Sequence, residues 1–398
     1  MGNGARRANK TLYCAEGSVH LYSSEPLMLT PADLYKVKKD PRLRELVKDC
    51  NVYTITTRPR ILIRPGSLSV SSAALSGDFI VRRSSGIVNV PFEMVVPPEW
   101  GAIVADSVEL APNGTHIDLV LGQTQLQMLV HFIVANARSA LTQVDTDLEV
   151  LYVGQGIGRI HKRSALDRLL LGHTTLQRIL AEMNTFHPHS EILLLLYRFE
   201  HRRTFISTGG DLTADPLATE KEERAHLDRM RMVSLTRHEE VALAEAALIR
   251  HFQPFFNMQI KQNNFSGRSK LQVLDRLLKK DMIGLIVEIC SAKHNSRLRT
   301  ADCPPLELSD FFSPEVLNGS NIESNEIKLE WQRELHLIAH THYAQSSLTT
   351  SEERDNFMHG VRWHGADQRS GFLGGLSGPS SPGSRNVDGA RRRGNNTG

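Results

Sequence analysis

A tyrosine, a glutamate and an asparagine in this sequence could take part together in metal-assisted phosphodiester cleavage. Tyr152 stands near the end of a predicted strand, residues 148–153, which closes at Gly154. Glu245 lies in a predicted helix among apolar residues, and Asn257 follows shortly after that helix ends. A phenol can help to deprotonate a nucleophile, a carboxylate can hold a hard cation, and an amide can orient its neighbours.

The helix that carries Glu245 is predicted from its sequence pattern. Thr236-Arg237-His238-Glu239 is a capping box, and Pro254 marks the end of the helix. Glu245 falls inside an apolar stripe of helical period, formed by Val241, Ala244, Leu248, Ile249 and Phe252. A carboxylate that faces a core must be paired, protonated or bound to a cation, because desolvating it alone is costly. A structural ion pair with an arginine and a metal or catalytic role are both consistent with this position.

The order of these motifs resembles that of the GIY-YIG nuclease superfamily. The Tyr-Ile-Gly motif of that family is matched by Tyr152-Val153-Gly154, and its Glu-Ala-x-Leu-Ile motif by Glu245-Ala246-Ala247-Leu248-Ile249. The family asparagine follows a proline in a short turn, as in Pro254-Phe255-Phe256-Asn257. The resemblance covers roughly residues 130–260. It implies a small domain with a three-stranded antiparallel sheet flanked by helices.

The resemblance also implies residues outside these motifs. The family has a catalytic arginine at the start of the next helix, for which Arg163 is the match and Arg159 is close enough to compete. A histidine often follows, and His173 is the candidate. The first family motif, Gly-Ile-Tyr on the preceding strand, has no clear counterpart. The strand expected to hold it, residues 130–134, contains no tyrosine.

The chemistry that the resemblance implies needs one divalent cation, Mg²⁺ or Mn²⁺, held by Glu245. Such an ion polarises the scissile phosphate and stabilises the leaving oxygen. Arg163 would hold the phosphate, and Tyr152 would help to deprotonate the nucleophile. His173 would assist proton transfer, and Asn257 would orient neighbouring groups.

A nucleic-acid partner, DNA in the first instance, requires a local basic surface because the net charge of the chain is only +3. The span from Arg159 to Arg178 carries five Lys or Arg residues and one Asp. The residues expected to contact nucleic acid are Arg159, Lys162, Arg168 and Arg178. A solvated helix face explains the same charges equally well.

The sequence predicts an α+β protein in which a GIY-YIG-like unit is preceded by a β-rich domain. Residues 123–141 are expected to be helical, with a strand at 130–134 as the alternative, and residues 209–229 read as an inserted loop. The expected divisions are a loose end with short helices at 1–51, a β-rich domain at 52–125, the nuclease-like domain at 126–262, an α/β extension at 263–345, and a disordered polar tail at 346–398.

Three other patterns suggest different functions. Gly154-Gln155-Gly156-Ile157-Gly158 follows a strand, but its spacing departs from the dinucleotide-binding fingerprint. His336, His340 and His342 cluster near a helix end, which is a weak indication of a zinc site. A binding module that keeps the GIY-YIG fold without activity remains the main alternative, since the first-motif tyrosine is missing.

The sequence indicates a cytoplasmic protein without membrane segments. Its four cysteines form no CxxC pair, as expected in a reducing compartment. The longest apolar run, Ile192 to Tyr197, is too short to cross a bilayer. The first residues contain no apolar segment of a secretory signal. The oligomeric state is left open.

Overall fold

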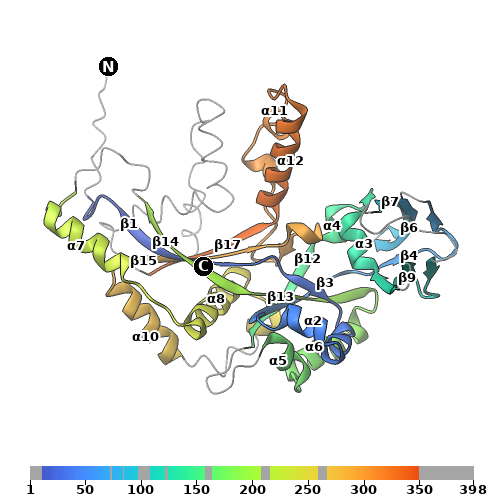
Figure 1. The fold of residues 1–398 in the computed structure, drawn as a ribbon, viewed down its shortest axis with the longest axis horizontal. Coiled ribbons are helices and arrows are strands. Elements are labelled where there is room, and N and C mark those ends of the chain that lie inside the picture. The colour runs from blue at the N-terminus through green and yellow to red at the C-terminus, as the bar shows by residue number, and fades with distance from the viewer. Residues whose placement is uncertain are drawn as a thin grey trace, which may run out of the picture.

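The computed structural model shows a mixed α/β protein whose sheets follow one another along its long axis (Figure 1). The structure describes residues 11–71, 74–83, 85–96, 108–121, 124–156, 164–207, 216–258 and 267–348. In these residues the strands form four sheets. The expected polar tail from residue 349 onward and the first ten residues lie outside the described part of the chain.

A five-stranded sheet at the centre of the molecule carries the candidate site. Its order is β16 (Leu298–Arg299), β12 (Leu148–Gln155), β3 (Val52–Pro59), β13 (Ser190–Tyr197) and β2 (Leu27–Leu29). β3 pairs antiparallel with both β12 and β13 and is therefore the middle strand of a three-stranded antiparallel core. This differs from the sequence-based division, in which residues 52–59 open the β-rich domain. Strand pairing is decided by partners far away in the chain, so a local pattern could not assign this strand to its sheet.

Helices cover both faces of this sheet. One face packs against α5 (Ala165–Leu170) and α6 (Thr174–Phe186), beside α1 (Asp33–Lys39) and α2 (Pro41–Val47). The opposite face packs against α8 (Arg237–Phe252), which begins with the expected Thr236 capping box. The expected apolar stripe of α8 is confirmed, since its five positions are buried: Val241, Ala244, Leu248, Ile249 and Phe252.

The chain between β3 and β12 forms a β-rich unit with a hydrophobic core of its own. One sheet has the order β11-β7-β6-β4, with β5 also paired to β6, and another has the order β10-β9-β8. Its elements are β4 (Ile61–Ile63), β5 (Ser69–Val70), β6 (Ala74–Arg83), β7 (Gly86–Val95), β8 (Val108–Leu110), β9 (His116–Leu121), β10 (Thr124–Leu129), α3 (Val130–Asn136), β11 (Arg138–Ser139) and α4 (Gln143–Thr146). Residues 130–134 are therefore helical, and the prediction that they form the strand of the first family motif is wrong.

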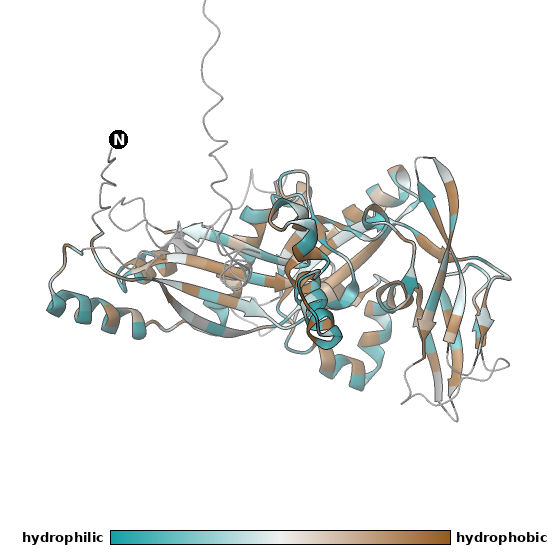
Figure 2. Ribbon diagram, turned by 90° about the horizontal axis from the view of Figure 1, so that it is seen from above, coloured by the Kyte–Doolittle hydropathy of each residue, from teal (hydrophilic) through white to brown (hydrophobic). Residues whose placement is uncertain are grey.

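A second large sheet joins the two ends of the described chain. Its order is β14 (Phe199–Ser207), β1 (Glu16–Ser23), β15 (Met282–Cys290) and β17 (Thr341–Ser347). β1 was expected to belong to a loose end, but it lies between β14 and β15 and is almost entirely buried. Figure 2 shows that hydrophobic residues concentrate on the strands of the sheets. A buried strand with Ser and His among its apolar residues has no clear alternation, which explains why its pattern was missed.

Short helices complete the C-terminal half. They are α7 (Glu220–Arg231), α10 (Gly267–Leu278), the 3₁₀ turns η3 (Ala292–His294) and η4 (Leu308–Asp310), α11 (Pro314–Leu317) and α12 (Asn325–Ala339). α7 occupies the second half of the segment expected to be an inserted loop, and its dense charges lie on a largely exposed helix. Among the helices in the described ranges, none combines the length and hydrophobicity needed to cross a bilayer.

Candidate functional site

The pairing of β3 with β12 brings two tyrosines to one face of the sheet. Tyr53 lies opposite Gly154 in the antiparallel ladder. The register shifts between Val150 and Tyr152, so that Leu151 is the extra residue of a β-bulge. Consecutive strand residues normally face opposite sides, yet Leu151 and Tyr152 both contact the core beneath α5 and α6. The bulge therefore turns Tyr152 toward the same side as Tyr53.

Gly154 provides the space in which these two rings meet. A Cβ atom at this position would lie 2.5 Å from Oη of Tyr53 and 2.7 Å from Cε1 of Tyr152. The ring centroids of the two tyrosines are 6.2 Å apart. Gly156 is equally restricted, because a Cβ there would lie 2.3 Å from the backbone nitrogen of Ala165. Packing thus accounts for both glycines without a bound nucleotide.

His173 connects the hydroxyl of Tyr53 to the first turn of α6. Its Nδ1 accepts the backbone N–H of Leu176 at 2.8 Å, which makes His173 the N-cap of α6. Thr174 is therefore the first residue of the helix and not its cap. Nε2 of His173 lies 2.5 Å from Oη of Tyr53. Since Nδ1 is an acceptor, the proton of the neutral ring belongs on Nε2, which donates to the tyrosine oxygen.

The protonation states of these groups follow from burial and from two nearby charges. Burial, aided by the charge of Arg168, lowers the pKa of His173 to about 4, so the ring is neutral at pH 7. Burial also raises the pKa of Tyr53 well above its usual value and raises that of Tyr152. The charge of Glu245 raises the pKa of both hydroxyls, whereas the charge of Arg168 lowers both. One carboxylate and one guanidinium therefore act on the same pair of phenols.

Glu245 and Arg168 approach this cluster from different helices. Glu245 is partly buried on α8, between the buried Val241 and Ile249. Arg168 lies on α5 and is exposed, and its charge lowers the pKa of Tyr53. An exposed guanidinium beside these phenols can bind an anion at the surface.

Asn257 fastens the turn after α8 to β12. Its Oδ1 accepts the N–H of Val153 at 2.7 Å, and its Nδ2 donates to the carbonyl of Val153 at 2.9 Å. The side chain is buried. Its amide bonds to the Val153 backbone as the backbone of a neighbouring strand would, next to Tyr152. Asn257 thus holds the turn after α8 against β12.

The structure brings Tyr152, His173, Glu245 and Asn257 to this part of the sheet. Arg159, Lys162 and Arg163 lie outside the described residues. Arg168 was expected only to contact nucleic acid. Its charge lowers the pKa of both tyrosines. Arg178 is exposed on α6, where it pairs with Glu182 at 2.6 Å and lies over the Phe256 ring.

Tyr53 is the residue that sequence reasoning missed. It lies in Asn51-Val52-Tyr53, where asparagine stands in place of the first glycine of Gly-Ile-Tyr. The β-rich unit separates Tyr53 from Tyr152, although the motif was sought on the strand immediately before residue 148. A search for a valine-tyrosine pair at the start of any earlier buried strand would have found it.

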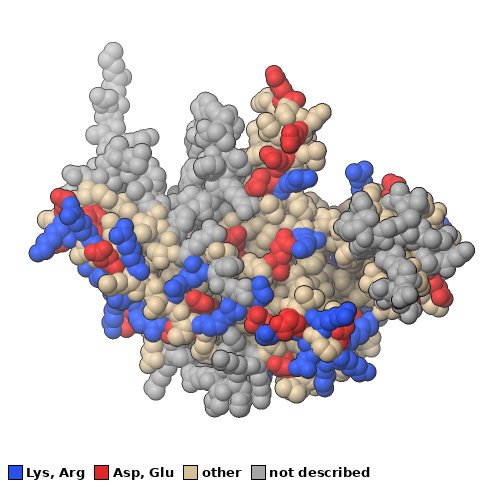
Figure 3. Space-filling model, in the orientation of Figure 1, with Lys and Arg blue, Asp and Glu red and all other residues tan. Residues whose placement is uncertain are grey.

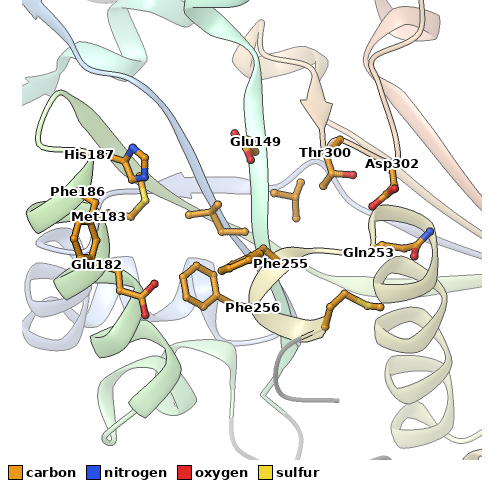
Figure 4. Close-up of a pocket in the computed structure, with 14 residues that line it drawn as sticks. Glu149, Glu182, Met183, Phe186, His187, Gln253, Phe255, Phe256, Thr300 and Asp302 are labelled. Atoms are coloured by element: carbon orange, nitrogen blue, oxygen red, sulfur yellow. The ribbon is translucent and has the colours of Figure 1, made fainter. Parts of the chain in front are cut away.

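A pocket of about 480 Å³ lies next to this site, between β12, α6 and residues 300–302. Figure 4 shows Phe255 and Phe256 in its middle, with Glu149 and Glu182 around them. Asp302 adds a third carboxylate to the lining. Three carboxylates around an apolar floor repel a phosphate backbone, so this pocket is unsuited to nucleic acid.

Glu288, another carboxylate in apolar surroundings, is explained without a role in this site. Its Oε2 lies 2.9 Å from Nε2 of His20 on the neighbouring strand β1. It therefore belongs to a pair within the second sheet.

No protein-family model matches this chain, and comparisons with curated proteins and with solved structures gave no match.

Proposed function

We propose that this protein is a metal-dependent endonuclease of the GIY-YIG kind. The observation that supports the proposal best is the cluster of Tyr53, Tyr152 and His173 under the opposing charges of Glu245 and Arg168, in which Tyr53 and His173 are hydrogen-bonded. The cluster lies on a three-stranded antiparallel core, the architecture that the sequence resemblance implies. In this proposal Asn51-Val52-Tyr53 takes the place of the first family motif.

The hydroxyls of the two tyrosines would hold the attacking water in position. His173 donates to the oxygen of Tyr53, so Tyr53 keeps its own proton available for a second hydrogen bond. The hydroxyls of Tyr53 and Tyr152 would orient the attacking water, whose proton would leave to a second water molecule. His173 would hold Tyr53 in position without itself titrating near pH 7.

The donor groups around Glu245 fit a hard cation. The charge of Glu245 acts on the phenols Tyr53 and Tyr152, and carboxylate and phenol oxygens suit Mg²⁺ or Mn²⁺. When bound, such an ion would stabilise the leaving oxygen and offset the carboxylate charge that raises both tyrosine pKa values. Arg168 would hold the phosphate and oppose the charge that develops on it, in place of the expected Arg163.

The proposed partner is nucleic acid, with DNA as the first substrate to test. Figure 3 shows Lys and Arg side chains over the surface where Figure 1 places α2 and α6, interspersed with acidic side chains. The exposed cations of α1 and α2 are Lys36, Lys38, Lys39, Arg42 and Arg44. α1 contacts α5, so these charges extend the basic surface outward from Arg168.

Cleavage of supercoiled plasmid and single-stranded DNA with Mg²⁺ or Mn²⁺ tests the function. We compare the wild type with Glu245→Gln, and use Glu240→Gln on the same helix as the matched control. Glu240 is partly buried and lies 3.7 Å from Arg202, so its loss also removes a helix carboxylate. We expect Glu245→Gln to lower metal-dependent nicking by at least about 100-fold, and Glu240→Gln to cleave like the wild type.

Equal cleavage by the wild type and Glu245→Gln would refute the assignment of this site. If the wild type binds DNA but cleaves neither substrate with either metal, the binding-module alternative replaces the proposal.

A further inference from the structure

A second cluster of metal-ligating side chains lies at the far end of α8. It consists of His251, Cys303 and His342, whose donor atoms all lie within 4.8 Å of one another. Nε2 of His251 is 3.3 Å from Nδ1 of His342 and 3.3 Å from Sγ of Cys303. His342 is buried, and the other two residues are partly buried. The three residues come from segments far apart in the chain.

Rigid elements hold each of these residues in place. His251 lies in the last turn of α8, and His342 lies on β17 with its ring against Phe252, at a centroid distance of 4.9 Å. Cys303 ends a turn that is attached to the same helix, because Oγ1 of Thr300 donates to the Phe252 carbonyl at 2.6 Å. The cluster is therefore preorganised by packing and by hydrogen bonds of its surroundings.

Hydrogen bonds alone do not satisfy the three metal-ligating atoms, which are Nε2 of His251, Nδ1 of His342 and Sγ of Cys303. The backbone of Leu298 favours a proton on the His342 ring, and since Nδ1 faces His251, Nε2 is the nitrogen left to carry that proton. Nδ1 of His342 then presents a lone pair, so His251 must carry its proton on Nε2 to bond with it. That same nitrogen cannot also accept a proton from the Cys303 thiol, which leaves the sulfur contact poorly matched.

We propose that His251, Cys303 and His342 bind one Zn²⁺ ion. Tetrahedral zinc with two nitrogens and one sulfur places its ligand atoms about 3.3–3.6 Å apart, close to the two distances observed here. The Leu298 backbone, which favours a proton on Nε2 of His342, is the kind of outer group that commonly orients a zinc-bound imidazole. The ligands found among the described residues leave the fourth position to a water molecule.

The zinc ion would join α8 to β17 and to the turn at Thr300. It would thereby fix the far end of the helix that carries Glu245, by contacts independent of the proposed nuclease chemistry. Of the three histidines noted in the sequence, only His342 takes part. Nε2 of His336 bonds to the carbonyl of Ala292, and Nδ1 of His340 bonds to the carbonyl of His336.

Metal analysis of the purified chain tests the proposal. We expect about one zinc ion per chain, and a thiolate-to-cobalt absorption band after replacement by Co²⁺. Cys303→Ser should lose both signals, whereas the matched thiol variant Cys290→Ser and the site variant Glu245→Gln should keep both. Wild-type protein without zinc, or a Cys303→Ser variant that keeps the cobalt band, would overturn the proposal whatever the result for cleavage.

A second measurement uses only the wild type, in case Cys303→Ser does not fold. Zinc should protect Cys303 from alkylation and leave the exposed Cys14 unprotected, as read by mass spectrometry. Equal alkylation of Cys303 with and without zinc would also overturn the proposal.

Discussion

Tyr53 shows how one side chain depends on several others at this site. Its hydroxyl accepts a hydrogen bond from His173, has its pKa lowered by the charge of Arg168, and lies in space that exists only because residue 154 is glycine. The same hydroxyl senses the charge of Glu245. The oxygen of Tyr53 is therefore the point through which the neighbouring groups influence one another.

Tyr53→Phe removes this oxygen and keeps the ring that packs over Gly154. We expect metal-dependent cleavage to fall by about 100-fold or more, because the attacking water loses one of the hydroxyls that orient it. The control is Tyr35→Phe, since Tyr35 is 66% exposed and remote from the pairing of β3 with β12. Rates would be measured on plasmid under single-turnover conditions. A Tyr53→Phe enzyme as fast as the wild type would exclude this phenol from the chemistry.

At the scale of elements, the sequence patterns predicted those features of helices and strands that depend on residues close together in the chain. The stripe and cap of α8 and the strand before Gly154 agree with the sequence. Neither the pairing of β3 with β12 nor the bulge at Leu151 has a local signal, because both depend on residues far away in the chain. The convergence of Glu245 and Asn257 on Tyr152 came from the family resemblance instead.

Asn257 joins two elements, and its replacement should destabilise both. In Asn257→Ala the N–H and carbonyl of Val153 lose their partners while buried, so the free energy of unfolding should fall by about 1–3 kcal/mol. Asn257→Asp should be no better, since a carboxylate repels the Val153 carbonyl. Urea denaturation measures the change, with the exposed Asn325→Ala as control. An unchanged unfolding free energy in both Asn257 variants would show that this contact stabilises nothing.

At the scale of the whole molecule, buried histidines make the fold sensitive to acid. Burial lowers the pKa of His131 and of His173 to about 4. The unfolded chain binds these protons near pH 6.5, so it holds more protons than the folded protein between pH 6.5 and about 4. Stability is therefore complete above pH 6.5 and is lost as the pH falls through this window.

Denaturation at several pH values between 7 and 4 measures this loss. Each such histidine can contribute up to about 1.4 kcal/mol of destabilisation per pH unit. His131→Gln should make the pH dependence shallower, whereas a variant of the exposed His187 should leave it unchanged. If His131→Gln and the wild type lose stability in parallel, the proton uptake belongs to other groups.

The β-rich unit that separates β3 from β12 also has a consequence for the time course of folding. Thr57 near the end of β3 pairs with Glu149 at the start of β12, so the unit leaves the sheet and returns to it at neighbouring residues. Closing an unstructured loop of this length would cost roughly 4 kcal/mol of chain entropy. If the unit folds first on its own core, that loop is already closed when the strands meet. The two tyrosines should then come together late, in an order that stopped-flow refolding can resolve, at a rate set by a region that gives the site none of the side chains described here.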